Sequence, residues 1–274
     1  MKKKLVLLSL LTVGLLSVTA CGKTETETKS EKDVIRIGGT SISQIYYDAC
    51  KEDFEKKGYK TEFVPFDANP VVLEACNSGD VDISIGQHLK FVESFNENKS
   101  GDLTMAKPYV FHTGIGLYSE KYDSVDALPE GAKIAVMNDP MNEDIAMRIL
   151  QENGLVELKE GKDLYTKADV TANPKNIDIV EMEQGQTVTA LEDLDAACVF
   201  FTHMSSAGKD PTKYIARDTV MIRYPMGVIV KKENENAPWA VDFAESMRTP
   251  ESQKVIEEKF PGVFTFYKSD DEAK

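Results

Sequence analysis

Short apolar runs alternate with amphipathic helical patterns along most of this sequence, and that alternation restricts the fold more than any other feature. We expect strands at residues 34–37, 61–66, 82–87, 114–119, 133–138, 178–182, 196–201, 220–224 and 227–231. Helical patterns lie at about residues 45–54, 70–78, 89–96, 141–153, 238–248 and 250–260. In the helix at 70–78 the expected buried residues are Val71, Val72 and Ala75. Repeated strand–helix–strand units predict an α/β fold with largely parallel sheets.

The N-terminus has the pattern of a secretory signal. Three lysines follow Met1, and the apolar run from Leu5 to Leu16 has 12 residues. A membrane-spanning helix needs about 20 residues, so this run is too short to remain as one. The following Val18-Thr19-Ala20-Cys21 resembles the lipobox of bacterial lipoproteins. We therefore expect residues 1–20 to be removed and Cys21 to carry the lipid anchor. The alternative is a plain secretory signal, with Cys21 as an ordinary residue.

Removal of the first 20 residues, which carry three lysines and no acid, leaves 254 residues and changes the formal net charge from −14 to −17. Residues 21–33 are polar and predict a flexible tether behind the lipidated cysteine. The expected location is the cell membrane, facing outside the cytoplasm. The surplus of Asp and Glu over Lys and Arg argues against nucleic acid as a partner. Cys50, Cys76 and Cys198 indicate buried free thiols, with a Cys50–Cys76 bridge left open.

Candidate site residues follow from the strand ends, because ligands of such sheets bind beyond the carboxyl ends of the strands. The segments concerned include all three histidines and lie at residues 38–41, 67–70, 87–88, 111–112, 138–142, 200–203 and 224–226. The sequence has no G-x-S-x-G, H-E-x-x-H, P-loop or complete G-x-G-x-x-G motif. Three scattered histidines make no metal signature. We therefore expect no enzymatic activity, catalytic residue, cofactor or metal.

From Gly79 onward the sequence resembles the NlpA family of bacterial lipoproteins, which includes methionine-binding proteins of ABC importers. The matching segments are collinear and lie at residues 79–82, 87–88, 116–119, 128–131, 135–140, 142–143, 173–176, 195–197, 210–213 and 257–260. The resemblance implies a two-lobed type II periplasmic-binding-protein fold with a ligand cleft between the lobes. It also implies a small-molecule ligand, ABC permease and ATPase partners, and a monomer.

By the family's pattern, lobe one covers residues 34–111 plus 227–274, and lobe two covers residues 112–226. The chain would cross between the lobes near residues 111–114 and 224–227, and the lobes would close around the ligand.

Several pocket positions implied by the resemblance differ from the family's methionine-binding pattern. Ile145 stands where that pattern has an Arg for the ligand carboxylate, and Phe200 and Met226 replace two Asn. Asn69 and Gly86 replace aromatic residues. The sequence keeps Gln87, His88 and Asn142, and it keeps an aromatic side chain at Phe91. The resemblance and the strand ends together give these expected ligand-binding residues: Asn69, Gln87, His88, Phe91, Phe111, Asn142, Ile145, Phe200, Thr202 and Met226.

Replacement of the carboxylate and amide anchors by apolar residues changes the expected ligand. A buried ion without a partner costs several kcal/mol, so a zwitterion would bind poorly here. We expect a solute-binding lipoprotein whose ligand is less polar than methionine or lacks a free carboxylate. Two alternatives remain open: a receptor for methionine or a related amino acid, and a surface lipoprotein that has lost ligand binding.

Overall fold

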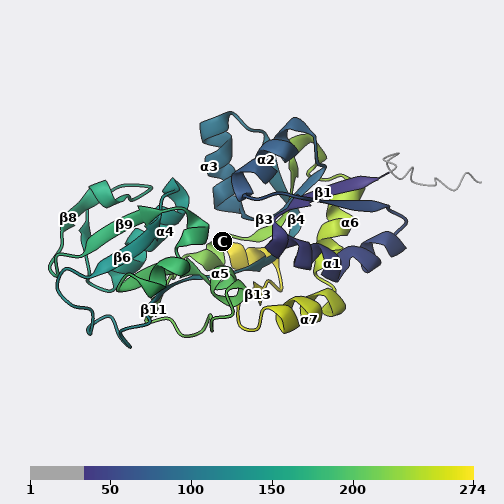
Figure 1. Cartoon of the computed structure of the whole chain (residues 1–274). Helices are drawn as coiled ribbons and strands as arrows, with labels where there is room; N and C mark the ends of the chain where they lie inside the picture. Colours follow the sequence, from purple (N-terminus) through teal and green to yellow (C-terminus); the bar gives the residue numbers. More distant parts are fainter. Residues whose placement is uncertain (1–33) are drawn as a thin grey trace, which may run out of the picture. The chain divides into compact units, whose positions relative to one another are not determined.

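The computed structural model describes residues 34–274, and the expected signal peptide, Cys21 and the tether lie outside these residues. Two mixed sheets organise the described chain, whose elements are coloured in sequence order in Figure 1. The first sheet has six strands in the order β13-β4-β12-β3-β1-β2. Its strands are β1 (Ile35–Gly39), β2 (Thr61–Pro65), β3 (Ile83–His88), β4 (Leu103–His112), β12 (Met226–Lys231) and β13 (Thr265–Phe266).

The second sheet has five strands in the order β11-β5-β10-β6-β9. They are β5 (Ile115–Tyr118), β6 (Lys133–Met137), β9 (Asp178–Met182), β10 (Ala196–Phe200) and β11 (Ala216–Arg217). A separate two-stranded ladder pairs β7 (Glu157–Leu158) with β8 (Val170–Ala172). The chain enters the second sheet between β4 and β5 and returns to the first between β11 and β12.

The α-helices connect these strands. They are α1 (Ser41–Lys56), α2 (Asn69–Ser78), α3 (Leu89–Lys99), α4 (Pro140–Glu152), α5 (Phe201–Ser206), α6 (Pro238–Met247) and α7 (Pro250–Lys259). Short 3-10 helices are η1 (Lys167–Asp169), η2 (Gln184–Gln186), η3 (Thr189–Glu192), η4 (Met221–Arg223), η5 (Lys232–Asn234) and η6 (Asp270–Ala273). Among residues 34–274, no helix combines the length and apolar composition that crossing a membrane requires.

Local sequence explains where the helices around the site begin and end. The Asp139 side chain accepts a hydrogen bond from the backbone N–H of Asn142, which caps the first turn of α4. Pro140 follows at the first helical position, where its missing N–H removes no intrahelical bond. Gly79 ends α2 in the left-handed region at a φ of 90°.

The expected α/β class is present, but the sheets are less parallel than the sequence pattern predicts. Strand β1 is parallel to β2 and β3, whereas β12 is antiparallel to both β3 and β4. In the second sheet β6 is parallel to β9 and β10, whereas β5 is antiparallel to β10 and β11. The antiparallel strands β5 and β12 are the ones that directly follow the two crossings of the chain between the sheets.

Strand β4 is missing from the sequence prediction because Lys107-Pro108 interrupts its apolar pattern. Proline cannot donate to a ladder and normally argues against an interior strand. The pairing with β12 accommodates it through an irregular register: Val228 faces Ala106 and Met226 faces Phe111, so the residues between Ala106 and Phe111 bulge out of that ladder.

Two smaller predictions also fail. The pattern at residues 220–224 contains the 3-10 helix η4 instead of a strand. Val71 is 47% exposed, whereas Val72 and Ala75 are buried as expected. Val71 follows Pro70 at the beginning of α2, on the side of the helix that faces away from the core.

Three clusters of buried apolar side chains form the core. One cluster includes Cys50, Phe111 and Met226, the second includes Ile145, Cys198 and Phe200, and the third includes Cys76. Cys50 is a free, buried thiol, so the bridge to Cys76 that the sequence left open is not formed. The Cys76 thiol instead lies 3.7 Å from the carbonyl oxygen of Ile229.

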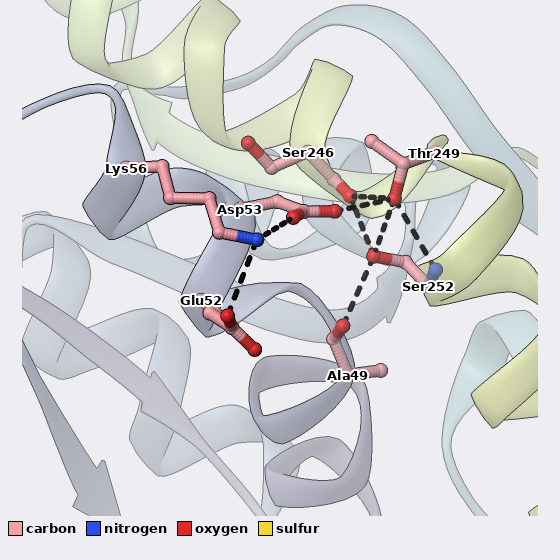
Figure 2. A network of polar contacts seen from close by, with 7 residues as sticks. All are labelled: Ala49, Glu52, Asp53, Lys56, Ser246, Thr249 and Ser252. Atoms are coloured by element: carbon pink, nitrogen blue, oxygen red, sulfur yellow. Dashed lines mark hydrogen bonds and ion pairs between the residues drawn. The ribbon is translucent and has the colours of Figure 1, made fainter.

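A polar network fixes α1 against the turn between α6 and α7 (Figure 2). Asp53 accepts a hydrogen bond from the Thr249 hydroxyl at 3.0 Å and another from Lys56 at 3.2 Å. These two contacts lower the pKa of Asp53. Ser252 donates to the carbonyl oxygen of Ala49 at 3.0 Å. The network matters for the site because the N-terminal half of α1 lines the cavity described next.

Candidate functional site

A cavity of about 380 Å³ lies where the strands of both sheets end. Its lining comes from the residues after β1, β2, β3, β6, β9 and β10, with additional residues from α1, α3 and the start of β12. This is the position at which α/β sheets bind ligands, and the volume is within the usual range for small-molecule sites.

The structure brings eight of the ten expected ligand-binding residues to this cavity. They are Asn69, Gln87, His88, Phe91, Asn142, Phe200, Thr202 and Met226. Four of them agree directly with the strand-end rule, because Gln87, His88, Phe200 and Thr202 lie at or within two residues of the carboxyl end of a strand.

Phe111 and Ile145 do not line the cavity. Phe111 is 1% exposed, and its ring packs against Tyr46 at 5.3 Å and Phe264 at 4.5 Å between centroids. Ile145 is fully buried in the core cluster beneath α4. In this chain the position aligned with the family's Arg is therefore a packing position. Arg148, one turn further along α4, binds Asp144 at 2.9 Å and lies over the Tyr165 ring.

His88 connects the two sheets through a short chain of hydrogen bonds. Its Nδ1 accepts from the backbone N–H of Phe91 at 3.1 Å and so caps α3. A neutral imidazole has one acceptor and one donor nitrogen, so the proton is on Nε2. Nε2 lies 3.3 Å from Oδ1 of Asn142 and donates to it. Burial lowers the pKa of His88 to about 4, so the ring is neutral at pH 7.

Asn142 is held on its other side by Asp139. Its Nδ2 donates to Oδ2 of Asp139 at 2.9 Å, and its backbone N–H donates to Oδ1 at 3.1 Å. Burial raises the pKa of Asp139, while the two bonds from Asn142 oppose that change. His88 and Asn142, which this sequence shares with the family's pattern, are thus hydrogen-bonded to each other and to the first turns of α3 and α4.

A second polar chain runs along the side of the cavity formed by the first sheet. The Ser84 hydroxyl donates to Oε1 of Gln87 at 2.7 Å, and Nε2 of Gln87 donates to Oδ1 of Asn69 at 3.0 Å. In residues 34–274, every fully enclosed side-chain nitrogen or oxygen has a hydrogen-bond partner. The cavity wall therefore satisfies its enclosed polar atoms without a ligand.

Gly86 allows α1 to approach β3 closely. Its φ is +108°, and a Cβ atom there would lie 2.1 Å from Oγ of Ser43. An aromatic side chain, which the resemblance placed at this position, would collide with α1. The glycine is therefore required by the packing of this chain.

The sequence analysis missed several lining residues, among them Tyr46, Thr113, Asp139, Glu183 and His203. Asp139 and His203 lie within the strand-end segments but are absent from the set of expected ligand-binding residues. Glu183 directly follows the predicted strand at 178–182, so the strand-end rule could have found it. Tyr46 lies in the second turn of α1, where its apolar neighbours indicated a core position.

The charged side chains of the cavity lining are acidic. Asp67, Asp139 and Glu183 contribute carboxylates, and no Lys or Arg of residues 34–274 lines the cavity. Burial lowers the pKa of His203 as well as that of His88. His112 does not line the cavity; its Nδ1 lies 3.1 Å from the carbonyl oxygen of the lining residue Thr113. No group of three or more His, Cys, Asp or Glu in the described residues could hold a metal ion.

Two mixed β-sheets with connecting helices, and a cavity at their strand ends, are the architecture of periplasmic solute-binding proteins. The sequence pattern of the family described as NlpA lipoprotein matches residues 35–265. The chain therefore belongs to the NlpA lipoprotein family, as its motifs predicted.

Individual relatives match over nearly their whole length. Lipoprotein 28 of Escherichia coli K12 is 31% identical over 263 residues, which cover 93% of each chain. The D-methionine-binding lipoprotein MetQ of Salmonella typhi is 29% identical over 259 residues, covering 91% of this chain and 93% of its own.

Solved structures agree with this fold. A nutrient-binding protein of Burkholderia cenocepacia bound to methionine has 28% identity and a TM-score of 0.78, over 85% of this chain and 99% of its own. The substrate-binding protein of a methionine transporter from Streptococcus pneumoniae has 30% identity and a TM-score of 0.78, over 86% and 96%.

Proposed function

We propose that this chain is a lipid-anchored, extracytoplasmic solute-binding protein that delivers a small ligand to an ABC permease and its ATPase. The observation that carries the proposal is the cavity of about 380 Å³ at the strand ends of both sheets. Membership of the NlpA lipoprotein family supports the lipid anchor at Cys21, and relatives named as substrate-binding proteins support a role in transport. Ligand binding without turnover is expected.

The ligand is not held through a carboxylate in the manner implied by the family. No Lys or Arg of the described residues lines the cavity, and Phe200 and Met226 contribute apolar surface. A carboxylate buried there would lose its hydration without gaining a cationic partner, at a cost of several kcal/mol. The enclosed polar atoms of the wall already have partners, so they create no demand for a highly polar ligand.

A second candidate is a receptor for methionine in a different binding arrangement. The solved structure from Burkholderia cenocepacia is described as bound to methionine, and it matches 85% of this chain. The loss of ligand binding altogether is disfavoured by the cavity, which stays open although Phe200 and Met226 line it.

Thermal unfolding of the chain from Asp33 onward, with and without 1 mM L-methionine, separates these candidates. Residues 34–274 contain both sheets and all three core clusters, so this form retains the site. A micromolar ligand at thousandfold excess stabilises by about 4 kcal/mol. For a chain of this size that shifts Tm by roughly 8–16 °C. We expect no shift; a shift of that size would establish methionine as a ligand and refute the carboxylate argument.

The anchor is tested separately with the full chain. Cys21→Ser is expected to abolish incorporation of labelled fatty acid into the protein, because the thiol that would carry the lipid is lost. Cys198→Ser is the matched control, since Cys198 is buried in the core. Labelling of the Cys21→Ser protein to the level of the Cys198→Ser control would refute the proposed anchor.

A further inference from the structure

We propose that the ligand of this cavity is a small organic cation that lacks a free carboxylate; this rests on the proposed function. The first observation is the charge of the lining. Asp67, Asp139 and Glu183 line the cavity, whereas no Lys or Arg of residues 34–274 does. Carboxylates accept hydrogen bonds and stabilise a nearby ammonium, but they oppose an anion.

The histidines do not reverse this balance. His88 is buried, and both of its ring nitrogens are engaged, with the Phe91 backbone and the Asn142 side chain. His203 is partly buried with its ring 6.0 Å from that of Phe200. Burial disfavours the charged form of both rings, so the positive charge in the complex has to come from the ligand.

The second observation is a buried hydroxyl without a protein partner. Tyr46 is 1% exposed and lines the cavity, and its hydroxyl forms no hydrogen bond with residues 34–274. Every fully enclosed polar side-chain atom of these residues has a partner, so the Tyr46 hydroxyl opens onto the cavity. No group of the described residues occupies the oxygen of this hydroxyl, so a ligand ammonium N–H could donate to it.

Aromatic side chains strengthen the case for a cation. Phe91 and Phe200 line the cavity together with Tyr46. Aromatic rings attract cations through their quadrupole, and such rings beside carboxylates suit amines and quaternary ammonium groups. The formal net charge of −14 for the whole chain also favours the approach of a cation over that of an anion.

Ligands that share one side chain and differ in charge provide the test. We would measure binding of 3-(methylthio)propylamine and L-methioninamide (cations), L-methionine (zwitterion) and N-acetyl-L-methionine (anion), with choline as a quaternary cation. Isothermal titration of the chain from Asp33 onward at pH 7 gives each Kd. At least one cation is expected to bind ten-fold or more tightly than the zwitterion and the anion.

Variants then tie the preference to the lining. Glu183→Gln and Asp67→Asn are each expected to weaken binding of the preferred cation about two- to five-fold, the range for exposed charge pairs. Glu62→Gln removes the same charge from an exposed position on β2 outside the lining and should change Kd less than two-fold. Tyr46→Phe keeps the ring and is expected to weaken binding about five- to ten-fold.

The outcomes separate this inference from the proposed function. Tighter binding of methionine or its N-acetyl derivative than of every cation overturns the inference and leaves solute binding intact. Equal effects of Glu183→Gln and Glu62→Gln also overturn it. If none of the five compounds binds at 10 mM, the inference of a cationic ligand is refuted. The proposed solute-binding function is refuted as well only if native mass spectrometry also detects no adduct after incubation with a low-molecular-weight metabolite extract.

Discussion

Two sets of polar residues in and directly behind the cavity lining differ in where their atoms find partners. Ser84, Gln87, His88 and Asn142 are bound to one another or to nearby backbone and side-chain groups. We call this set the bonded wall. The Tyr46 hydroxyl makes no hydrogen bond with residues 34–274, and the carboxylates of Asp67 and Glu183 are exposed. We call this second set the open groups.

The difference separates structural polarity from polarity that a ligand can use. The bonded wall gives the cavity its shape, because hydrogen bonds fix its side chains in place. The open groups still have donor or acceptor capacity and therefore determine which ligand chemistry fits. The two sets predict opposite results on substitution: loss of stability for the bonded wall, and loss of affinity with little change in stability for the open groups.

The largest expected effect is at Gly86, which lets α1 pack against the bonded wall. Gly86→Ala places a Cβ 2.1 Å from Oγ of Ser43 and requires a φ of +108°. We expect a loss of roughly 3–5 kcal/mol in the free energy of unfolding, from combined strain and overpacking. Urea unfolding measures it. Gly208→Ala, at a φ of +71° with open space around it, is the control for backbone strain alone.

Adding Ser43→Ala to Gly86→Ala tests the cause. The double variant removes the nearest atom and leaves the Ser43 Cβ at 3.3 Å, so part of the stability should return. A double variant as unstable as Gly86→Ala would contradict the close approach as the source of the effect.

The second effect is a pH dependence that comes from His88. An unfolded histidine has a pKa of about 6.5, and burial lowers that of His88 to about 4. Between these values the unfolded chain takes up a proton that the native state refuses. The free energy of unfolding therefore falls as the pH drops from 6.5 to 4, by about 3 kcal/mol.

Denaturant unfolding at pH 7, 5.5 and 4 checks the His88 contribution by comparing wild type with His88→Gln. Glutamine does not titrate, so the difference between the two proteins should shrink or reverse toward pH 4. Parallel pH profiles for the two proteins would show that His88 is not buried as a neutral ring.

A smaller effect is expected from Ser84→Ala in the bonded wall. This change leaves the buried Oε1 of Gln87 without its 2.7 Å donor and should cost about 1–2 kcal/mol. Thermal unfolding is the measurement, with Ser205→Ala, at a half-buried position in α5, as the control expected to remain within 0.5 kcal/mol. Equal Tm values for the two variants would show that the Ser84 hydrogen bond does not stabilise the bonded wall.

The smallest effect on stability is expected at Tyr46. Tyr46→Phe removes a hydroxyl that has no hydrogen bond with residues 34–274, so the free energy of unfolding should change by less than about 0.5 kcal/mol. Calorimetric unfolding in the absence of ligand checks this. A loss above 1.5 kcal/mol would place Tyr46 in the bonded wall and weaken its assignment to the ligand.

Much of this site could be predicted because the chain's periodicity locates strand ends. The alternation of strands and helices predicts that Gln87, His88 and Asn142 lie at strand ends, on the side where ligands bind. Of the open groups, Asp67 lies in a strand-end segment and Glu183 directly follows a predicted strand, so only Tyr46 escapes the strand-end rule. Tyr46 lies among apolar residues of a helix, and its sequence pattern is that of a core position even though its hydroxyl reaches the cavity.

The errors have separate physical causes. Proline in β4 concealed a central strand, because the bulge that accommodates it depends on β12, more than 100 residues further along the chain. Ile145 and Phe111 lie close in sequence to lining residues, yet the helix turn and the strand pleat direct them into the core. When both faces of a helix or strand are buried, the spacing of apolar residues does not tell which side chains point into the core and which into the cavity.

The order in which the strands occur in the chain has a consequence for folding after export. All five strands of the second sheet lie between Ile115 and Arg217, whereas the first sheet needs β12 between β3 and β4. As a secreted chain arrives outside the membrane from its N-terminus, the second sheet can therefore assemble while the first still lacks a central strand. The cavity needs Met226 from β12, so the binding site is completed only after about four fifths of the chain has crossed.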